Sequence, residues 1–476
     1  MVFSTIIFLL RFLPITLALY YLAPPKLKNT VLFLCSLVFY CWGEVRFFPV
    51  MLALILINYL CGLGLERFEQ NKPARLILLL IALAGSLGML FYFKYANFVL
   101  SSINAIFGTG FAPIQGISVL PLGISFYTFQ TLSYTIDVYR RDVETEHNII
   151  DFGAYVVMFP QLIAGPIVKY RDVSDRLHVY KGRYELKQIE DGMTLFTFGL
   201  AKKVLLADAI GALWTDIIGV ADSPSVSFVG LANASTPLVW LGVIAYSLQL
   251  YFDFSGYSLM AMGLGQMLAL PVPRNFDLPY TARSVSEFYR RWHITLGTWF
   301  RDYVYIPLGG SRNGNARTVL SLTVVWFFTG LWHGASWNFV LWGVMLLGFI
   351  LLEKFCIGNF LKEHKVLSHV YLLFVIPQTW VIFRITRLKD VGAYFSRLFP
   401  LFGAHSAISA QDVLKLLSSY WWLLLLAIFF CLPQPRRFYE KHRGSLLVQL
   451  PLFLLFWVCV YFIATSSGNA FLYSRF

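Results

Sequence analysis

The chain has 476 residues, of which 58% are hydrophobic and 17% aromatic, while only 13% are charged. A water-facing surface needs about 25–35% charged residues, so this composition, with a mean hydropathy of +0.66, excludes a soluble enzyme. The formal net charge of +13 would suit nucleic acid, but the basic residues stand in short loops between apolar runs, which is typical of membrane proteins.

Long apolar runs predict transmembrane helices along the whole chain. A helix of about 20 apolar residues crosses roughly 30 Å of hydrocarbon and satisfies its own backbone hydrogen bonds. We therefore predict an all-α polytopic bundle of roughly ten to twelve transmembrane helices plus re-entrant or interfacial helices, in a single domain over residues 1–476. The predicted spans begin near Phe3, Thr30, Phe47, Leu76, Val119, Met193, Pro237, Thr318, Trp337, Val370, Tyr420 and Val448.

Basic residues in the loops set the expected orientation, because loops rich in lysine and arginine stay in the cytoplasm. The uncharged segments 100–118 and 223–237 are expected outside. The basic loop 436–443 precedes the last span, which places the tail, residues 466–476, on the extracytoplasmic side. Loops should alternate between the cytoplasmic and the outer side, and this order would place the basic residues of segment 387–415 outside. An amphipathic helix on the membrane surface is one possible explanation for them.

The first unusual segment, FPQLIAGP at residues 159–166, interrupts an apolar run with two prolines and a glycine. A broken helix at membrane depth must be buried in protein or line a cavity. A simple kink before a cytoplasmic loop is an equally good explanation. Further along, Asp253 stands in an apolar run, where a functional role and a pair with an arginine are the alternatives.

The second segment, SEFYRRWHITLGTWFRDYVYIPLGG at residues 286–310, mixes arginines and a histidine with many aromatic residues. It is too charged to span and too aromatic for a free loop, so it predicts a re-entrant or interfacial helix in the cytoplasmic leaflet. Interfacial anchoring alone would explain the composition. Arginine also binds phosphate with two N–H groups and stacks on planar rings, which suits a phosphorylated, nucleotide-bearing ligand.

The third segment, FFTGLWHGASWN at residues 327–338, places His333 among apolar and small residues. A buried imidazole favours the neutral form, which can accept a proton near pH 7. The alternative is a structural histidine that donates to a carbonyl group. The sequence has no paired histidine or histidine–carboxylate spacing, so we expect neither a metal nor a bound cofactor.

Together these segments resemble the membrane-bound O-acyltransferase family, and within it the bacterial alginate O-acetyltransferase branch. The matching blocks are FPQLIAGPI (159–167), DFSGYSLMAMG (253–263), NFDLPY (275–280), the segment 286–310 and GLWHGASWNFVLWG (330–343). Two positions depart from the pattern: Tyr289 replaces the usual Trp, and Leu259 replaces a frequent Asp.

The resemblance implies transfer of an acyl group, by default acetyl, from cytoplasmic acetyl-CoA through a central tunnel or funnel for O-acetylation of an exported polysaccharide such as alginate. It implies His333 as the catalytic base and His293, near the cytoplasmic mouth, as the residue that positions the donor or the tunnel wall. The residues expected to bind the donor are Arg290, Arg291, Arg301, Trp292 and Trp299. The residues expected to line or support the tunnel are Trp332, Asn338, Asp253 and Gln161.

The tail, FLYSRF at residues 471–476, resembles the C-terminal motif of the partner peptide that works with the D-alanyl transferase of teichoic acids. This resemblance implies Tyr473 as a built-in acyl relay to an extracytoplasmic SGNH-type acetyltransferase partner. An aromatic anchor at the membrane surface is the alternative. The expected setting is the bacterial inner (cytoplasmic) membrane, with the lipid bilayer and acyl-CoA as partners and no nucleic acid.

Two other functions compete with this one. The first is transfer of D-alanine or another acyl group to teichoic acid. The second is transport of a small solute, because broken helices and polar groups at the midplane also describe carriers. The sequence shows no inverted repeat and few acids in the apolar runs, which disfavours the carrier.

Overall fold

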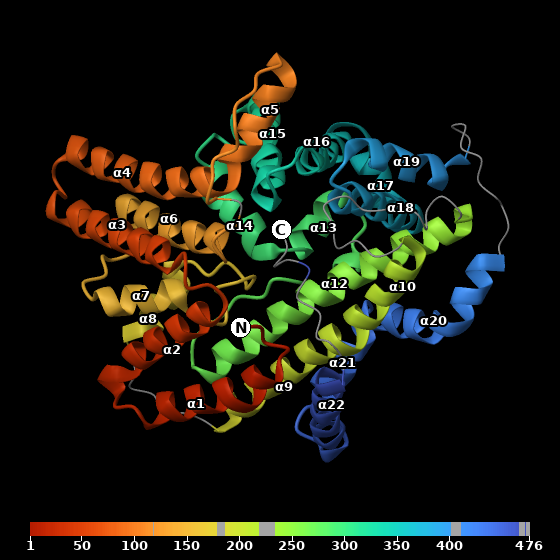
Figure 1. Cartoon of the computed structure of the whole chain (residues 1–476), viewed down its shortest axis with the longest axis horizontal. Helices are drawn as coiled ribbons and strands as arrows, with labels where there is room; N and C mark the ends of the chain where they lie inside the picture. Colours follow the sequence, from red (N-terminus) through yellow and green to blue (C-terminus); the bar gives the residue numbers. More distant parts are fainter. Residues whose placement is uncertain (118, 179–185, 219–233, 401–410, 466–471, 473–476) are drawn as a thin grey trace. The chain divides into compact units, whose positions relative to one another are not determined.

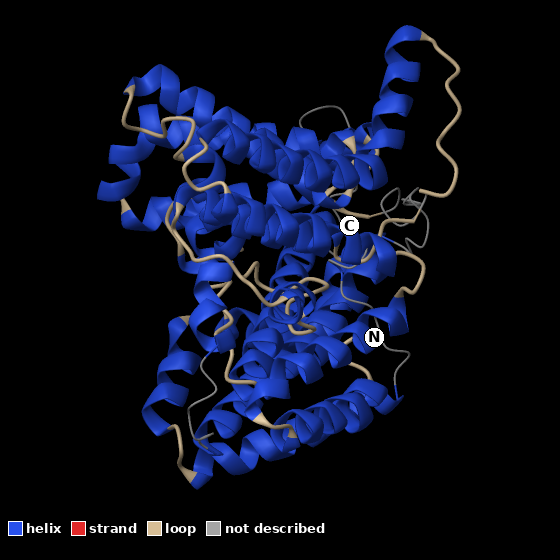
Figure 2. Ribbon diagram, turned by 90° about the vertical axis from the view of Figure 1, so that its left-hand side faces the viewer, coloured by secondary structure: helices blue, strands red, loops and turns tan. Residues whose placement is uncertain are grey.

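The computed structural model of the chain describes residues 1–117, 119–178, 186–218, 234–400, 411–465 and 472. These residues form helices joined by loops, with no strand among them (Figures 1 and 2). The predicted all-α class is therefore confirmed. Two compact units can be distinguished, Met1–Phe198 with Tyr257–Arg274, and Gly199–Gly256 with Asn275–Leu472.

The first unit contains the N-terminal helices of the chain, several of which pack directly on one another. Their bounds are α1 Leu13–Leu22, α2 Lys28–Gly43, α3 Phe48–Arg67, α4 Lys72–Leu90, α5 Ala96–Phe107, α6 Ile124–Arg140, α7 Ile149–Val157, α8 Tyr170–His178 and α9 Leu186–Ala201. The helices α3, α4 and α6 pack on one another, as do α2 and α7 (Figure 1). α9 ends three residues inside the second unit.

Polar side chains join α3, α4 and α6. Asn58 of α3 donates its amide to the hydroxyl of Ser86 in α4 at 2.9 Å, and Thr135 of α6 donates to Oδ1 of Asn58 at 2.8 Å. All three side chains are buried. Hydrogen bonds between helices in an apolar environment contribute about 1 kcal/mol each. This network explains why a helix as polar as α6 can be buried on all sides.

The helices of the second unit include several short ones that interrupt the long spans. Their bounds are α10 Asp208–Ile218, α13 Val285–Arg291, α14 Ile294–Phe300, α15 Gly314–His333, α16 Trp337–Leu352, α17 Gly358–Glu363, α18 Lys365–Arg384, α19 Leu388–Leu398, α20 Gln411–Phe430, α21 Pro433–His442 and α22 Leu446–Thr465. The long helix α12 (Thr236–Met267) begins in this unit and ends in the first.

Single turns of π-helix continue several of these helices. In the second unit they are η4 Lys202–Ala207, η6 Arg301–Tyr305 and η7 Glu353–Ile357. A π-turn accommodates one extra residue in a helix and occurs often at functional sites.

Glycines bring α15 and α16 into backbone contact. The Cα of Gly330 in α15 lies beside Gly343 in α16, and a Cβ on Gly343 would overlap the carbonyl oxygen of Trp326. A Cβ on Gly330 would likewise overlap the carbonyl oxygen of Phe339. Small residues that let helix backbones approach are typical of membrane bundles. This contact fixes the C-terminal end of α15, where His333 is the last residue.

Seven helices in the described ranges are long and apolar enough to cross a membrane. They are Phe48–Arg67, Lys72–Phe107, Thr236–Met267, Trp337–Glu363, Lys365–Arg384, Gln411–Phe430 and Leu446–Thr465. This number is smaller than the predicted ten to twelve. The spans predicted near Val119 and Thr318 fold as α6, which is short and polar, and α15, which carries Arg317 and His333. Neighbouring helices cover α6, whereas α15 keeps exposed apolar residues such as Leu320 and Phe328.

The structure decides two points that the sequence left open. The chain leaves the helical conformation between the end of α7 at Val157 and the start of α8 at Tyr170, and the intervening segment is buried. The charged segment after residue 387 forms the amphipathic helix α19, which buries Val391, Tyr394 and Leu398.

The α15–α16 contact predicts a large effect for Gly343→Ala. The added methyl group has no space, so we expect a loss of about 1–3 kcal/mol in the free energy of unfolding, as for other overpacked cores. Gly348→Ala in the same helix is the matched control, since nothing lies within 4 Å of its Cβ position. Thermal unfolding of the purified protein in detergent tests both variants. Equal melting temperatures for the two would contradict the packing described here.

Candidate active site

The site is built on α13 and α14, two short helices of seven residues each in the second unit. Ser284 caps α13 by accepting a hydrogen bond from the backbone N–H of Glu287 at 3.0 Å. The carboxylate of Glu353 accepts from the backbone N–H groups of Val285 and Ser286, and from the Ser286 hydroxyl at 2.6 Å. These contacts satisfy the unpaired donors at the start of α13. Glu353 was not predicted as part of the site.

His293 joins α13 to α14 in a left-handed backbone conformation, with φ 48° and ψ 52°. This conformation costs a non-glycine residue about 1–2 kcal/mol, so the surroundings must hold it in place. The backbone N–H of Ile294 donates to the carbonyl of Asn275 at 3.0 Å, and Phe276 forms an antiparallel bridge with Trp292. The NFDLPY segment therefore serves as the support for the RRWH turn.

The side chain of Asn275 also fixes the tautomer of His293. Its Oδ1 lies 3.1 Å from Nδ1 of His293 and accepts from the backbone N–H and the hydroxyl of Thr295 at 3.1 and 2.9 Å. Because a backbone N–H can only donate, this atom of Asn275 is the oxygen. Nδ1 of His293 therefore carries the hydrogen, and Nε2 carries the lone pair in the neutral ring.

His333 is the last residue of α15 and is surrounded by aromatic rings. Its ring centroid lies 5.0 Å from Trp332, 5.1 Å from Trp342 and 5.2 Å from Phe383, all in edge-on geometry. The helix ends at Gly334, where any side chain would overlap the ring of Phe339. This glycine lets the chain turn closely behind the imidazole.

The structure brings the two predicted histidines together. The ring centroids of His293 and His333 are 6.5 Å apart, and the ring of Trp332 contacts both. Both histidines are nearly fully buried. They are 40 positions apart in the sequence, so their proximity depends on the packing of the turn at His293 against Trp332 and His333 at the end of α15.

Both histidines line a cavity of about 1030 Å³ in the second unit. This volume is at the upper end of the range typical of ligand pockets. Trp292 and Trp342 contribute apolar walls, and residues of η6 and η7 contribute part of the lining. The charged residues of the lining are mostly basic: Arg283, Arg290, Arg301, Lys354 and Lys362, with Glu287 and Glu353 as acids. Such a cavity suits an anionic ligand with a planar or apolar part.

Two of the five predicted donor-binding residues lie outside the cavity lining. Arg291 is not part of the lining, because its guanidinium pairs with Glu287 at 2.6 Å and donates to the hydroxyl of Thr281 at 3.0 Å. Trp299 is buried against Tyr303, with ring centroids 5.1 Å apart. Sequence reasoning missed Arg283, Lys354 and Lys362, which stand in ordinary polar contexts and carry no motif.

The predicted supporting residues make structural contacts. Asn338 donates its amide to the carbonyls of Ile382 and Phe383 at 3.0 and 3.2 Å, which links α16 to α18. Gln161, in the first unit, donates to the carbonyl of Tyr155 at 2.6 Å. Asp253 forms a buried ion pair with Lys203 at 2.7 Å, so its observed partner is a lysine where an arginine was considered. Tyr473 lies outside the described residues.

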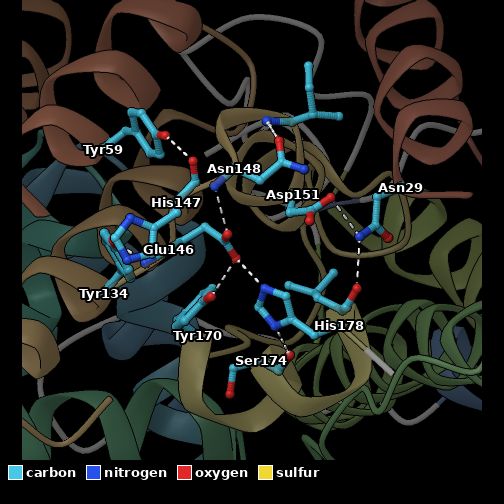
Figure 3. Close-up of polar contacts among 12 residues, drawn as sticks. Asn29, Tyr59, Tyr134, Glu146, His147, Asn148, Asp151, Tyr170, Ser174 and His178 are labelled. Carbon is cyan, nitrogen blue, oxygen red and sulfur yellow. Dashed lines mark hydrogen bonds and ion pairs between the residues drawn. The ribbon is translucent and has the colours of Figure 1, made fainter. Parts of the chain in front are cut away.

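A second polar cluster lies in the first unit, away from any predicted site residue (Figure 3). Glu146, Asp151 and His178 place one potential metal-ligating atom each within 4.8 Å of one another. The buried carboxylate of Glu146 already accepts from Tyr170 at 2.8 Å and faces Nε2 of His178 at 2.9 Å.

The remaining contacts of this cluster are also made within the protein. Nδ1 of His178 faces the carbonyl of Ser174 at 2.8 Å, and Asp151 accepts from the amide of Asn29 at 2.8 Å (Figure 3). Burial, followed by the charge of Glu146, raises the pKa of Asp151. Because these groups pair with one another, the cluster is explained as a link among α2, α7 and α8.

Comparison with known proteins gives a consistent result. The sequence model of the MBOAT, membrane-bound O-acyltransferase family matches residues 90–388. The chain is 41% identical to a probable alginate O-acetylase AlgI of Pseudomonas syringae pv. tomato, over 84% of this chain and 75% of that protein. It is 30% identical to a peptidoglycan O-acetyltransferase of Helicobacter pylori, over 100% of this chain and 98% of that protein. A teichoic acid D-alanyltransferase of Streptococcus thermophilus is 28% identical, over 46% and 53% of the two chains.

The burial of His293 predicts a pH-dependent stability. Burial lowers the pKa of His293 to about 3, whereas an unfolded histidine titrates near 6.5. Between these values the unfolded chain binds a proton that the folded chain does not, so stability falls as pH decreases from 6.5 towards 3. His293→Gln removes this contribution, and we expect its melting temperature to fall less than that of the parent protein between pH 7 and pH 5. Parallel falls in detergent melting curves would contradict a buried neutral imidazole.

Proposed function

Because the chain belongs to the membrane-bound O-acyltransferase family and is an O-acyltransferase, we propose that it moves an acetyl group from cytoplasmic acetyl-CoA across the membrane for O-acetylation of an exported polysaccharide. The observation that carries this proposal is the pair His293 and His333, placed 6.5 Å apart on the wall of a basic cavity. The names of the relatives above support an acetyl group and a polysaccharide acceptor.

The cavity suits a coenzyme A thioester. Arg290 and Arg301 lie in its lining with three further basic side chains, and they would bind the phosphates of the donor. Trp292 would provide an apolar surface for the planar base or the pantetheine chain. Arg291 and Trp299 do not line the cavity and would act only through their neighbours, by holding α13 and η6 in place.

His333 would act as the general base. The acceptor hydroxyl attacks the thioester carbonyl carbon, its proton passes to the imidazole, and the carbon–sulfur bond breaks. The departing thiolate of coenzyme A then takes the proton from the imidazolium and leaves as the free thiol. The C-terminal end of α15 carries partial negative charge, which would stabilise this transient imidazolium. A positioned base supplies roughly 10²–10⁴-fold of the rate, and alignment of the reactants supplies much of the rest.

His293 would hold the donor in place. Its low pKa keeps the ring neutral at physiological pH, so it cannot supply a proton as an imidazolium. With the hydrogen on Nδ1 directed at Asn275, the lone pair of Nε2 would accept from a donor N–H or O–H on the ligand. Trp332 contacts both histidines and would keep their rings apart at a fixed distance.

Tyr473 would carry the acetyl group onward. Its phenol oxygen would be the acceptor in the step above, which leaves an acetyl ester on the tail, residues 466–476. That ester would pass the acetyl group to the serine of an extracytoplasmic SGNH-type acetyltransferase, which would modify the polysaccharide. The excess of basic residues before α22 supports an outward-facing tail, in the cytoplasmic membrane of a bacterium.

Transfer of D-alanine to teichoic acid is the second candidate function. The similarity to a D-alanyltransferase supports it, but that match covers only 46% of this chain, against 84% for the alginate relative. Radiolabel from acetyl-CoA appearing on the protein or on the polymer would favour the acetyl reaction. Movement of solute without label transfer would favour a carrier and contradict both reactions.

His333→Ala is the main test of the base. We expect a fall of about 10²–10⁴-fold in acetyl transfer, because the proton of the attacking hydroxyl loses its acceptor. The matched control is His364→Ala, an exposed histidine outside the cavity, which should keep full activity. Initial rates with radiolabelled acetyl-CoA in membranes, at equal protein levels, provide the measurement. Normal transfer by the His333 variant would remove this histidine from the mechanism.

Tyr473→Phe tests the relay. The substitution removes one oxygen atom and keeps the aromatic ring, so an aromatic anchor would survive it while an acyl carrier would not. We expect polymer acetylation to disappear, together with any acetyl ester found on the C-terminal peptide by mass spectrometry. Phe471→Tyr combined with Tyr473→Phe serves as a control for the position of the hydroxyl. Unchanged polymer acetylation in Tyr473→Phe would leave the tail as an anchor.

A further inference from the structure

Helix α21 lies in the connection between two helices that can cross a membrane. α20 ends at Phe430 and α22 begins at Leu446, and both are long and apolar enough to span. α21 packs against both of them (Figure 1). It has ten residues and is therefore about 15 Å long. A chain that leaves the bilayer in α20 and re-enters it in α22 has room for α21 only at the membrane surface.

One face of α21 is tied to the segment that supports the candidate active site. Nη1 of Arg436 lies 2.9 Å from Oδ1 of Asp277. Asp277 directly follows Phe276, which forms the bridge to Trp292, and the backbone N–H of Asp277 donates to the carbonyl of Arg291 at 2.9 Å. Arg436 therefore holds the end of the short ladder on which the RRWH turn is built.

A second face of α21 is basic, aromatic and exposed. Residues three or four positions apart share one face of a helix. We call the residues at this spacing on α21 the outer stripe, and they are Gln434, Arg437, Phe438 and Lys441. All four are exposed, and Phe438 is 62% exposed. Within the described residues no acid pairs with Arg437 or Lys441, because Glu440, the one acid of α21, is engaged by Arg436 at 2.7 Å.

The chemistry of the outer stripe fits the headgroup of an anionic phospholipid. Arginine and lysine bind phosphate, and an exposed aromatic ring enters the boundary between headgroups and acyl chains. Basic residues close to the end of a transmembrane helix also attract anionic lipids. Membrane topology alone explains basic residues in a loop. It does not explain why two of them share a helix face with an exposed phenylalanine.

We propose that the outer stripe of α21 binds the headgroups of anionic phospholipids, and that this contact holds α21 against the segment 275–277. The lipid surface goes beyond the proposed function, and only the kinetic test below rests on acetyl transfer. Arg436 is a positioning residue, since it does not line the cavity. Its side chain and that of Asp277 are 40% and 44% exposed, so the ion pair is weak by itself and the effect of lipid on transfer is at most about fivefold.

Lipid binding by the purified full-length protein is the first test. Phosphatidylglycerol or phosphatidylcholine is added in detergent, and native mass spectrometry measures the lipid retained. We expect the double variant Arg437→Gln/Lys441→Gln to bind phosphatidylglycerol roughly 10- to 30-fold more weakly, because each basic residue near an anionic surface contributes about fivefold. Binding of phosphatidylcholine should not change.

The matched control is Arg67→Gln/Lys72→Gln. It removes the same charge from exposed positions where α3 ends and α4 begins, and both of these helices can also span. We expect it to change phosphatidylglycerol binding less than about twofold, because these residues lie outside the outer stripe. An equal loss in both double variants, or no loss in the outer-stripe variant, would overturn the proposal.

Inorganic phosphate separates a lipid from a free anion. At constant ionic strength, an excess of phosphate should leave the retained phosphatidylglycerol unchanged, because the lipid is also held through its chains. Phe438→Ala should weaken lipid binding, because the ring no longer enters the bilayer boundary. Displacement of the lipid by phosphate would show that the outer stripe binds free phosphate, and would contradict a lipid surface.

Kinetics in vesicles test the link to the site. For the parent protein we expect kcat for acetyl transfer to be roughly two- to fivefold higher in phosphatidylcholine vesicles that contain phosphatidylglycerol than in those that do not. Arg436→Gln should retain the lipid but lose this response, and the outer-stripe variant should lose both. A purely structural role of Arg436 would lower the melting temperature and leave the response intact. A full response in Arg436→Gln would therefore overturn the link.

The two measurements also separate this proposal from the proposed function. If the parent protein transfers no acetyl group in any vesicle while the outer stripe still selects phosphatidylglycerol, the proposed function is wrong and the lipid surface stands. If transfer is normal while the outer-stripe variant retains as much phosphatidylglycerol as the parent, the lipid surface is wrong and the proposed function stands.

Discussion

A single carbonyl oxygen, Oδ1 of Asn275, organises the candidate active site. Three donors converge on it, two from Thr295 and one from His293, and they hold the histidine in a left-handed conformation that its own backbone disfavours. The orientation of α14, the tautomer of His293 and the direction of its lone pair all follow from this contact. Without it, the turn between α13 and α14 would relax, and the distance between the two imidazoles would no longer be fixed.

Buried polar groups hold this protein together at several places, and each has its partners close by. Asn58 links α3 and α4, Glu353 caps α13, and Lys203 pairs with Asp253. An unsatisfied polar group is costly in an apolar surrounding, so such contacts are made only in one arrangement of the helices. They give specificity to a chain whose apolar surfaces would otherwise pack in many ways.

The sequence predicted the features that depend on local composition, and missed those that depend on contacts distant in the chain. Prolines in an apolar run marked the helix break before α8, and an ionisable group among small residues marked His333. The partner of Asp253 could not be predicted, because Lys202 and Lys203 are adjacent and only the turn of η4 decides which one faces it. The burial of α6 was missed for the same reason, since neighbouring helices cover it rather than lipid.

The backbone contact between α15 and α16 has a consequence for how a group could cross the bilayer. Gly330 and Gly343 touch so closely that neither helix can slide along the other without a clash of main-chain atoms. The imidazole at the end of α15 is therefore held in a fixed position relative to α16. A carrier that alternates between two openings needs helices that rock around its binding site. In the proposed reaction, the cargo and the group that receives it would therefore approach a histidine that does not move against α16.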